Sequence, residues 1–156
     1  MTGEHIAGEP VAADRSGVGF LLGLAARVLW KKLAERLVDL GLDASAYIVM
    51  VNVAITEERD GRGPLVAEMV DQLALKPEEV DAATGRLTRL GLLKSVSQDG
   101  SIRLALQEKG RAMMPALQNE AHWLLENLLS GFTYEEIDAL GDYPRRLIGN
   151  LGGQAV

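Results

Sequence analysis

The chain has no cysteine and only two histidines, His5 and His122, among its 156 residues. Disulfides and thiolate metal sites are therefore excluded, and a reducing compartment is the simplest interpretation. A zinc site built on histidine needs more ligands than two histidines far apart in the sequence supply. We therefore expect neither a bound metal nor a cofactor.

Long hydrophobic runs are also missing. The most apolar stretch, residues 17–30, contains Arg27 and is too short to span a bilayer. The first fourteen residues carry Glu4, Glu9 and Asp14 and no basic segment, which argues against a secretory peptide. We expect a cytoplasmic protein with no membrane partner.

An excess of positive charge is the third absence, since the net charge is −6. Residues 15–41 carry five basic and two acidic side chains, whereas residues 64–111 carry seven of each. A DNA-binding surface normally has a basic stripe, because neutralised phosphates release counterions. Neither the net charge nor the charge of residues 64–111 indicates one.

The overall composition is that of a globular protein. The hydrophobic fraction of 47% and the charged fraction of 24% suit one globular domain, which we place at residues 16–156 after a disordered tail at 1–15.

The first half of this domain is predicted to be helical. Apolar residues recur at helical spacing from Ser16 to Leu40, and Gly41 is suited to end that helix. Asp43 is a good N-cap for a second helix through Ile55, which we expect to fade into a polar loop at residues 57–64.

The middle of the chain predicts two short helices followed by a β-hairpin. Pro64 and Pro77 each suit a first helical turn, and Gly91 should close the second helix, 77–90. Strands are expected at 93–97 and 102–106, around the turn Gln98-Asp99-Gly100. This succession is typical of a winged helix-turn-helix.

Two further helices should complete the chain. One is expected from Gln107 to about Leu129. The other starts at a capping box, Thr133 to Glu136, and Pro144 should break or kink it. The predicted fold class is mainly α with a small β-hairpin wing, flanked by N- and C-terminal helices.

Three local motifs resemble the MarR family of bacterial transcription regulators. Arg103–Ala112 resembles the family's junction of the second wing strand and the following helix, Gly85–Leu93 its passage from recognition helix to wing, and Phe132–Leu140 its capped last helix. The resemblance covers roughly residues 18–151. It implies a homodimer in which residues 16–42 and 107–156 are dimerisation helices and residues 43–106 form the winged helix-turn-helix.

The resemblance also implies which residues contact DNA. The helix 77–90 would lie in the major groove, and the wing would touch the backbone or minor groove. The expected DNA-binding residues come from this helix and the wing: Lys76, Glu78, Glu79, Asp81, Thr84, Arg86, Arg89, Gln98 and Arg103.

The acids among these residues depart from the family pattern. Relatives usually have Ser, Thr or Arg where this chain has Glu78, Glu79 and Asp81. A carboxylate can accept a hydrogen bond from cytosine N4, but near phosphate each one costs Coulomb energy. Alternatively, acids in a first helical turn simply complement the helix dipole. Arg86 and Arg89 are likewise either base readers or surface residues in ion pairs.

A small aromatic effector is the remaining partner that the resemblance implies. Trp30 and Tyr47 are candidates to line its pocket, because amphipathic aromatic side chains suit phenolic ligands, and core or dimer packing is the alternative role. No Gly-rich phosphate loop or nucleophile elbow is present, so we expect no catalytic residues and no enzyme.

We therefore predict a homodimeric DNA-binding transcription regulator that reads a pseudo-palindromic operator and acts as a ligand-responsive repressor. The alternative is a winged-helix dimer that has lost DNA reading and acts as a protein-interaction module.

Overall fold

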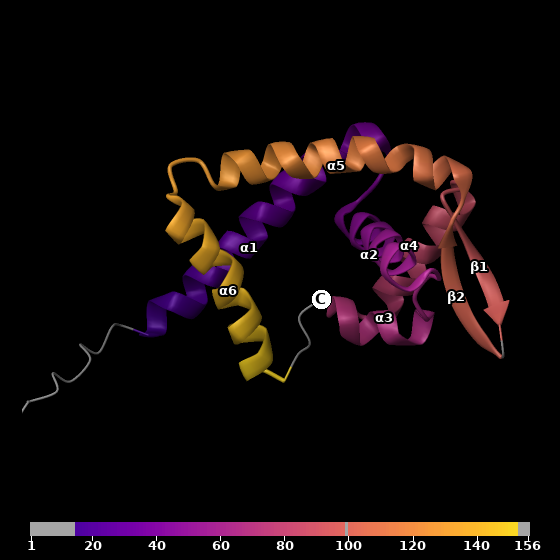
Figure 1. Cartoon of the computed structure of the whole chain (residues 1–156), viewed down its shortest axis with the longest axis horizontal. Helices are drawn as coiled ribbons and strands as arrows, with labels where there is room; N and C mark the ends of the chain where they lie inside the picture. The colour runs from indigo at the N-terminus through magenta and orange to yellow at the C-terminus, as the bar shows by residue number, and fades with distance from the viewer. Residues whose placement is uncertain (1–14, 99, 153–156) are drawn as a thin grey trace, which may run out of the picture.

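The computed structural model describes residues 15–98 and 100–152. This part of the chain contains six α-helices, one short 3-10 helix and a two-stranded antiparallel hairpin (Figure 1). In chain order they are α1 (Arg15–Leu37), η1 (Val38–Leu40), α2 (Ala44–Asp60), α3 (Val66–Leu73), α4 (Pro77–Arg89), β1 (Leu93–Gln98), β2 (Ser101–Leu106), α5 (Glu108–Leu128) and α6 (Tyr134–Asn150). The predicted fold class, mainly α with a β-hairpin wing, is confirmed.

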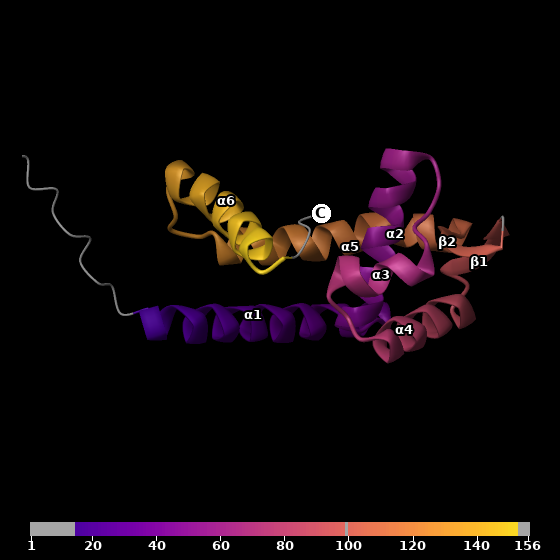
Figure 2. The same ribbon diagram turned by 90° about the horizontal axis from the view of Figure 1, so that it is seen from below.

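The molecule has two regions. We call α2, α3, α4 and the β1–β2 hairpin the winged lobe, and α1, the second half of α5 and α6 the helical arms. Figures 1 and 2 show the lobe gathered at one end, with α1 and α5 running away from it and α6 at the far end of α5.

The hydrophobic core lies mainly inside the winged lobe. It is built from apolar side chains of every lobe element, joined by two leucines at the base of α1 and one from α5. Its fully buried large members are Leu37, Val49, Met50, Val53, Met69, Val80, Leu87, Leu92, Leu93, Leu104 and Leu117. α6 buries none of its residues.

A close backbone approach holds the wing to the lobe. β1 and β2 pair from Leu93↔Leu106 to Gln98↔Ser101, and the amide of Leu104 donates to the carbonyl of Pro64 over 3.1 Å. Gly63 is buried in this approach, where an added Cβ would overlap the carbonyl oxygen of Leu104. Only glycine permits the chain before α3 to lie this close to β2.

Several predicted helix ends are confirmed. The Asp43 carboxylate accepts a hydrogen bond from the Ala46 amide over 2.8 Å, which caps α2. Thr133 and Glu136 form the expected capping box at the start of α6. Gly91 has a φ of 72° directly after α4, a left-handed conformation that glycine adopts without strain.

Two local predictions were wrong, and a third was wrong in part. α2 does not fade at Glu57 but continues to Asp60 and ends at Gly61, whose φ is 69°. Pro64 is not in a helical turn, because its carbonyl pairs with β2 and α3 begins only at Val66. Of the break or kink predicted at Pro144, the break is absent, because α6 runs on to Asn150; this helix is exposed, so water can bond to the carbonyl that the proline leaves free.

The predicted tail, residues 1–15, lies outside the described residues except for Arg15, at which α1 begins. Asp99 of the wing turn is likewise outside them. No single helix in the described ranges is long and apolar enough to cross a membrane. Only the combined residues 17–40 and 44–60 are long and apolar enough to do so, and these two segments meet at a bend of 81°.

Candidate nucleic-acid interface

The outward face of α4 is the first candidate surface. Val80, Ala83 and Leu87 point into the core. A helix turns by about 100° per residue, so the opposite side carries the exposed residues Glu78 and Asp81 and, about two to three turns later, Arg89. Two small residues, Ala82 and Gly85, lie between them. This face is therefore acidic in its first half and basic in its second half.

Glu79, the third acid, has a structural role. Its carboxylate accepts a hydrogen bond from the backbone amide of Lys76 over 2.9 Å, which satisfies an amide at the start of α4. Pro77 occupies the first turn of the same helix, as expected. Among the residues that the structure describes, Glu78 and Asp81 make no comparable contact, so their carboxylates face solvent.

Two expected readers, Arg86 and Thr84, face the protein itself. The Arg86 guanidinium donates to the Asp43 carboxylate over 2.7 Å and to the Gly41 carbonyl over 2.8 Å, which ties α4 to the start of α2. The hydroxyl oxygen of half-buried Thr84 is enclosed and has no hydrogen-bond partner in the described part of the chain. Arg89, by contrast, is exposed and donates only to the Gly85 carbonyl one turn earlier, over 3.3 Å.

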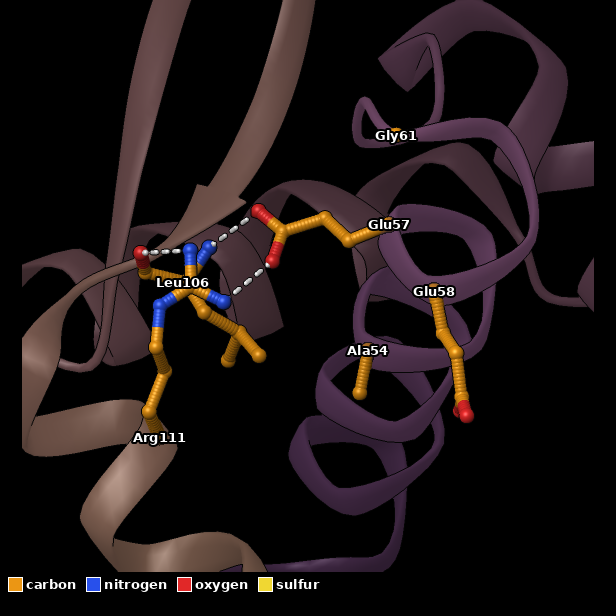
Figure 3. A pocket seen from close by; sticks show the side chains of 6 residues that line it. All are labelled: Ala54, Glu57, Glu58, Gly61, Leu106 and Arg111. Carbon is orange, nitrogen blue, oxygen red and sulfur yellow. Dashed lines mark hydrogen bonds and ion pairs between the residues drawn. The ribbon is translucent and has the colours of Figure 1, made fainter.

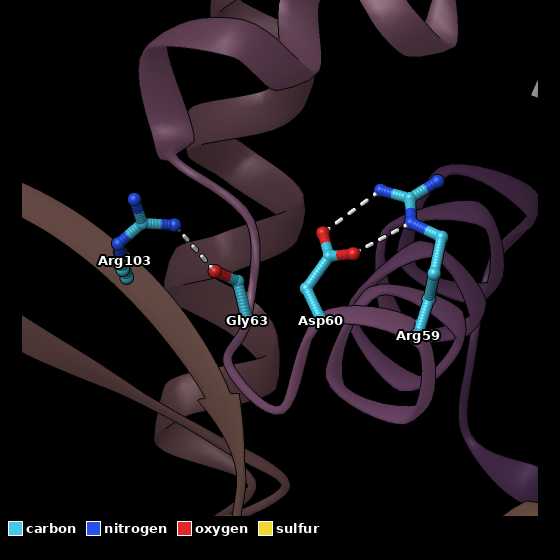
Figure 4. Close-up of polar contacts among 4 residues, drawn as sticks. All are labelled: Arg59, Asp60, Gly63 and Arg103. Atoms are coloured by element: carbon cyan, nitrogen blue, oxygen red, sulfur yellow. Dashed lines mark hydrogen bonds and ion pairs between the residues drawn. The ribbon is translucent and has the colours of Figure 1, made fainter.

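The wing presents Gln98 and Arg103 differently. Gln98 is exposed at the end of β1. Arg103 is half-buried, and its guanidinium donates to the Gly63 carbonyl over 2.9 Å (Figure 4). The part of its guanidinium that is not engaged remains available to a phosphate.

A small charged cluster lies next to this wing contact. Arg59 pairs with Asp60 in the last turn of α2, with an N–O distance of 2.8 Å (Figure 4). The hydrogen bond from Arg59 lowers the pKa of Asp60 below its usual value, and the charges of Arg62 and Arg103 act in the same direction. One carboxylate is thus held ionised among three arginines.

A second ion pair joins the lobe to α5. The Glu57 carboxylate accepts hydrogen bonds from the Leu106 amide over 3.0 Å and from the Arg111 guanidinium over 2.7 Å (Figure 3). Arg111 also donates to the Leu106 carbonyl over 3.3 Å. The Glu57 side chain is only 12% exposed, and an open pocket of about 350 Å³ lies beside it. Local sequence patterns do not predict this pair, because Glu57 lies in a polar stretch typical of a loop, although Arg111 belongs to the motif Arg103–Ala112.

The candidate effector residues do not share a described pocket. Trp30 is 41% exposed on α1, and Tyr47 is half-buried against the core, where burial raises its pKa. An apolar groove of about 570 Å³ lies instead between α1 and α5. Its lining residues are Leu21, Leu24, Ala25, Val28, Leu29, Lys32, Trp123, Leu124, Asn127 and Leu128.

Basic residues near the end of α1 are engaged within the chain. Lys32 pairs with Glu35 over 2.8 Å, and Arg36 pairs with Glu120 of α5. The Arg36 guanidinium also lies 4.2 Å from the centre of the Trp123 ring, a cation–π contact. Arg36 therefore joins α1 to α5, whereas the Lys32 pair lies within α1, and both side chains are engaged rather than extending a basic surface.

The helical arms expose many large apolar side chains. They come from α1, the end of α5, the turn that follows it, α6 and the residue after α6: Val18, Phe20, Leu21, Leu22, Leu24, Val28, Trp30, Trp123, Leu125, Leu128, Phe132, Tyr134, Leu140, Tyr143, Leu147, Ile148 and Leu151. Within the described ranges, no three acidic or histidine side chains are placed to hold a metal ion.

The overall structure is similar to solved transcription regulators. A MarR-family regulator from Rhodococcus sp. RHA1 superposes with a TM-score of 0.77 at 18% identity, over 87% of this chain and 95% of that chain. CouR from Rhodococcus jostii RHA1, bound to p-coumaroyl-CoA, gives 0.74 at 18% identity, over 83% and 90%. A MarR-family protein from Listeria monocytogenes in complex with a 26mer DNA gives 0.73 at 25% identity, over 83% and 85%.

The sequence itself matches no family model and no curated protein. The likeness therefore comes from the arrangement of the elements, which agrees over most of the chain with solved transcription regulators. The resemblance predicted from the three sequence motifs is confirmed, and the chain has the winged helix-turn-helix fold of the MarR transcriptional regulators.

Proposed function

We propose that the protein is a homodimeric DNA-binding transcription regulator of the MarR type. The observation that carries this proposal is the combination of a fully packed winged lobe with long helical arms whose apolar faces nothing in the described chain covers. A single chain with these arms is incomplete, and a second copy would place two α4 helices on one DNA duplex.

The arms fit a second copy because their apolar residues follow helical spacing. Leu140, Tyr143 and Leu147 of α6, and Leu151 directly after it, recur every three or four residues along one side. A groove of about 420 Å³ between α1 and α6 is lined by Val18, Leu22, Tyr143, Arg146, Leu147 and Asn150. Exposed apolar surface of this extent on a soluble fold marks an interaction site.

The DNA contacts that we propose come from the outward side of α4 and from the wing. Arg89 and Lys76 would contact bases or phosphates, Glu78 and Asp81 would accept hydrogen bonds from cytosine N4, and Gln98 and Arg103 would contact the backbone beside the wing. Glu79 and Arg86 would contribute mainly by holding α4 in place, since their side chains are bonded within the protein. The enclosed Thr84 hydroxyl faces the protein and is not proposed to contact DNA.

We also propose that the regulator is a ligand-responsive repressor. CouR is described with p-coumaroyl-CoA bound, so this fold can hold an aromatic ligand. A ligand at the arms or near Trp30 and Tyr47 would shift the equilibrium between dimer shapes and move the two α4 helices away from the spacing that DNA requires.

A second function, a protein-interaction module, is favoured by one observation. Glu78 and Asp81 occupy the first half of the outward face of α4 and are exposed, whereas Arg86 is held by Asp43. Phosphates would repel this half of the helix, and a basic protein surface would attract it.

Fluorescence-anisotropy titrations test the two functions against each other. Labelled fragments of the protein's own upstream region would be titrated at low and at physiological salt, with the parent and with a Glu78→Ser, Asp81→Thr variant that leaves the cap residue Glu79 intact. The matched control is Glu135→Ser, Asp138→Thr in α6, which removes the same two charges away from α4.

The outcomes separate cleanly. Fragment-selective binding by the parent that weakens steeply with salt supports the regulator, and loss of selectivity in the α4 variant makes its acids part of the base recognition. No binding by the parent, with binding restored only in the α4 variant, overturns DNA reading and supports the interaction module. For the ligand part, a Kd for DNA that stays constant across a panel of phenolic acids and their thioesters would contradict the proposal.

A further inference from the structure

Three arginines gather at the edge of the winged lobe where α2, the connection between α2 and α3 (residues 61–65) and β2 come together. Arg59 lies in the last turn of α2, Arg62 in the connection and Arg103 on β2. Arg59 and Arg62 are exposed, and Arg103 is half-buried. We call these three residues the arginine cluster.

The backbone of the connection brings the cluster together. The Arg103 guanidinium donates to the carbonyl of Gly63, the residue directly after Arg62, over 2.9 Å. Figure 4 shows the Arg103 guanidinium, the Gly63 carbonyl and the Arg59–Asp60 pair following one another along this connection. The hydrogen bond to Gly63 therefore fixes one edge of the Arg103 guanidinium and leaves its other donors beside the loop.

One carboxylate, that of Asp60, is bonded within the cluster. Both of its oxygens accept hydrogen bonds from the Arg59 guanidinium, over 2.8 and 3.0 Å. This hydrogen bonding is the main cause of the lowered pKa of Asp60, and the charges of Arg62 and Arg103 lower that pKa further. Within the described part of the chain, Arg103 is bonded only to a neutral carbonyl, and Arg62 makes no hydrogen bond or ion pair. Two positive charges are therefore left without a bonded anion.

Guanidinium groups that are held together without enough acids are suited to a phosphate. Each guanidinium presents its N–H donors in a planar fork that matches two phosphate oxygens. An anion that binds here also offsets the repulsion between the like charges of Arg62 and Arg103. Because the Gly63 carbonyl already orients Arg103, less side-chain freedom is lost when the ligand binds.

The cluster is distant from the end of α4 that carries Arg86. That end is tied to the start of α2 through Asp43, whereas Arg59 lies sixteen residues further along α2, which corresponds to about 24 Å of helix. Figure 2 shows α4 at the edge of the lobe and α2 extending away from it. The two surfaces also differ in charge, because the first half of the outward face of α4 presents Glu78 and Asp81.

We propose that Arg59, Arg62 and Arg103 form a phosphate-binding site of the winged lobe, separate from the outward face of α4. Two sources can supply the phosphate group: the backbone of a DNA duplex that extends past the wing, or a free phosphorylated molecule. The first source rests on the function proposed above, and the second does not.

Arginine side-chain NMR tests whether the site binds phosphate. The Nε–Hε signals of isotope-labelled protein would be assigned with single Arg→Lys substitutions. They would then be followed as inorganic phosphate is added, with chloride at equal ionic strength as the reference. We expect phosphate to shift the signals of the arginine cluster saturably and further than chloride does. Arg145 of α6 is the internal control, because it too lies near an exposed aspartate, Asp142, at 3.7 Å, and its signal should respond equally to both salts.

DNA titrations identify the source of the phosphate. Arg62→Gln removes a cluster charge that has no bonded partner in the described chain, and Arg145→Gln removes a matched exposed charge from α6. Each phosphate contact contributes about 0.9 to the slope of log Kd against log salt concentration, so loss of one contact in each copy of a dimer should lower the slope by about 2. Affinity should fall equally for all fragments, since phosphate contacts carry no sequence information. Arg145→Gln should keep the slope of the parent, and circular dichroism would verify that both variants are folded.

Each result decides the proposal. A lower slope for Arg62→Gln supports the site with DNA as its source. Phosphate-specific NMR shifts without a lower slope support the site with a free phosphorylated molecule as its ligand. The site is overturned if neither effect is found. If the parent binds no DNA, the regulator is contradicted, and the NMR titration alone decides whether the site exists.

Discussion

The winged lobe and the helical arms of this protein are stabilised in different ways. The lobe surrounds a core of fully buried side chains, including Met50, Met69 and Leu87, that come from three different helices. The arms leave most of their apolar residues on the surface, and α6 buries none. The lobe can therefore be stable through its own contacts, whereas the apolar faces of the arms are not covered by any part of the chain that the structure describes.

This difference predicts opposite responses to substitution. A change in the lobe should alter the free energy of unfolding, and a change on the exposed stripe of α6 should alter association and leave the lobe folded. The predictions that follow test this contrast, beginning with the largest effect.

The largest effect is expected for Leu147→Asp in α6. This leucine is 41% exposed in the single chain, so completing its burial in the proposed dimer contributes about 1 kcal/mol per copy. An aspartate would also place a charge in the interface, at a cost of at least about 1 kcal/mol per copy. Two copies give about 4 kcal/mol, so the dimer Kd should rise about 1000-fold. Analytical ultracentrifugation would measure the Kd, and circular dichroism should show a folded lobe. Arg145→Asp, which puts an acid on the polar side of the same helix, should leave the dimer intact. A Leu147→Asp protein that remains dimeric would show that this face is not the interface.

The next effect belongs to the lobe. Gly63→Ala would force a Cβ against the Leu104 carbonyl, a backbone atom that cannot move without disturbing β2. We expect the free energy of unfolding, measured with denaturant, to fall by about 3 kcal/mol, the upper end of the range for overpacked sites. Gly85→Ala is the control, because nothing lies within 4 Å of the added atom on the outward face of α4. It should stabilise the protein by roughly 0.5–1 kcal/mol. If Gly63→Ala and Gly85→Ala changed the free energy of unfolding equally, the close approach of Gly63 to the Leu104 carbonyl would be contradicted.

Much of this fold could be predicted from local chemistry. Asp43, Thr133 and Gly91 mark helix ends because each satisfies or permits a specific backbone arrangement, and all three do so in the structure. Pro64 was misplaced because a proline suits a first helical turn and an extended edge equally well. Pro64 is extended because its carbonyl accepts a hydrogen bond from Leu104 of β2, forty residues later in the sequence. A local sequence pattern contains no information about such a contact.

The candidate site was less predictable, for the same reason. The spacing of α4 could place Glu78, Asp81 and Arg89 on the outward side, since helical periodicity is local. That Arg86 is held by Asp43, or that Glu57 is held by Arg111, depends on packing between helices. Whether a charged side chain is free or paired therefore requires the tertiary structure.

A moderate effect should follow from loss of the contact between α4 and α2. Asp43→Ala removes both the N-cap of α2 and the partner of Arg86. A cap contributes about 1 kcal/mol and an exposed ion pair less than about 1 kcal/mol. We therefore expect the free energy of unfolding, measured with denaturant, to fall by about 1–2 kcal/mol. Asp43→Asn keeps an acceptor for the Ala46 amide and should lose only the smaller part. If Asp43→Asn is as destabilising as Asp43→Ala, the charge rather than the cap dominates.

The smallest effect concerns Tyr47, which lies against the lobe core rather than on the arms. Burial raises its pKa, so the folded protein holds the phenolic proton more tightly than the unfolded chain does. The stability contributed by the neutral phenol is fully present below the ordinary tyrosine pKa, and it is lost as the pH rises through the raised value. Denaturant unfolding measured at increasing alkaline pH should therefore show a steeper loss for the parent than for Tyr47→Phe. The exposed Tyr134 of α6 provides the matched control, and Tyr134→Phe should follow the parent. If Tyr47→Phe and the parent lose stability in parallel, the phenol is solvated in the folded protein, and this part of the lobe is as open to water as the arms are.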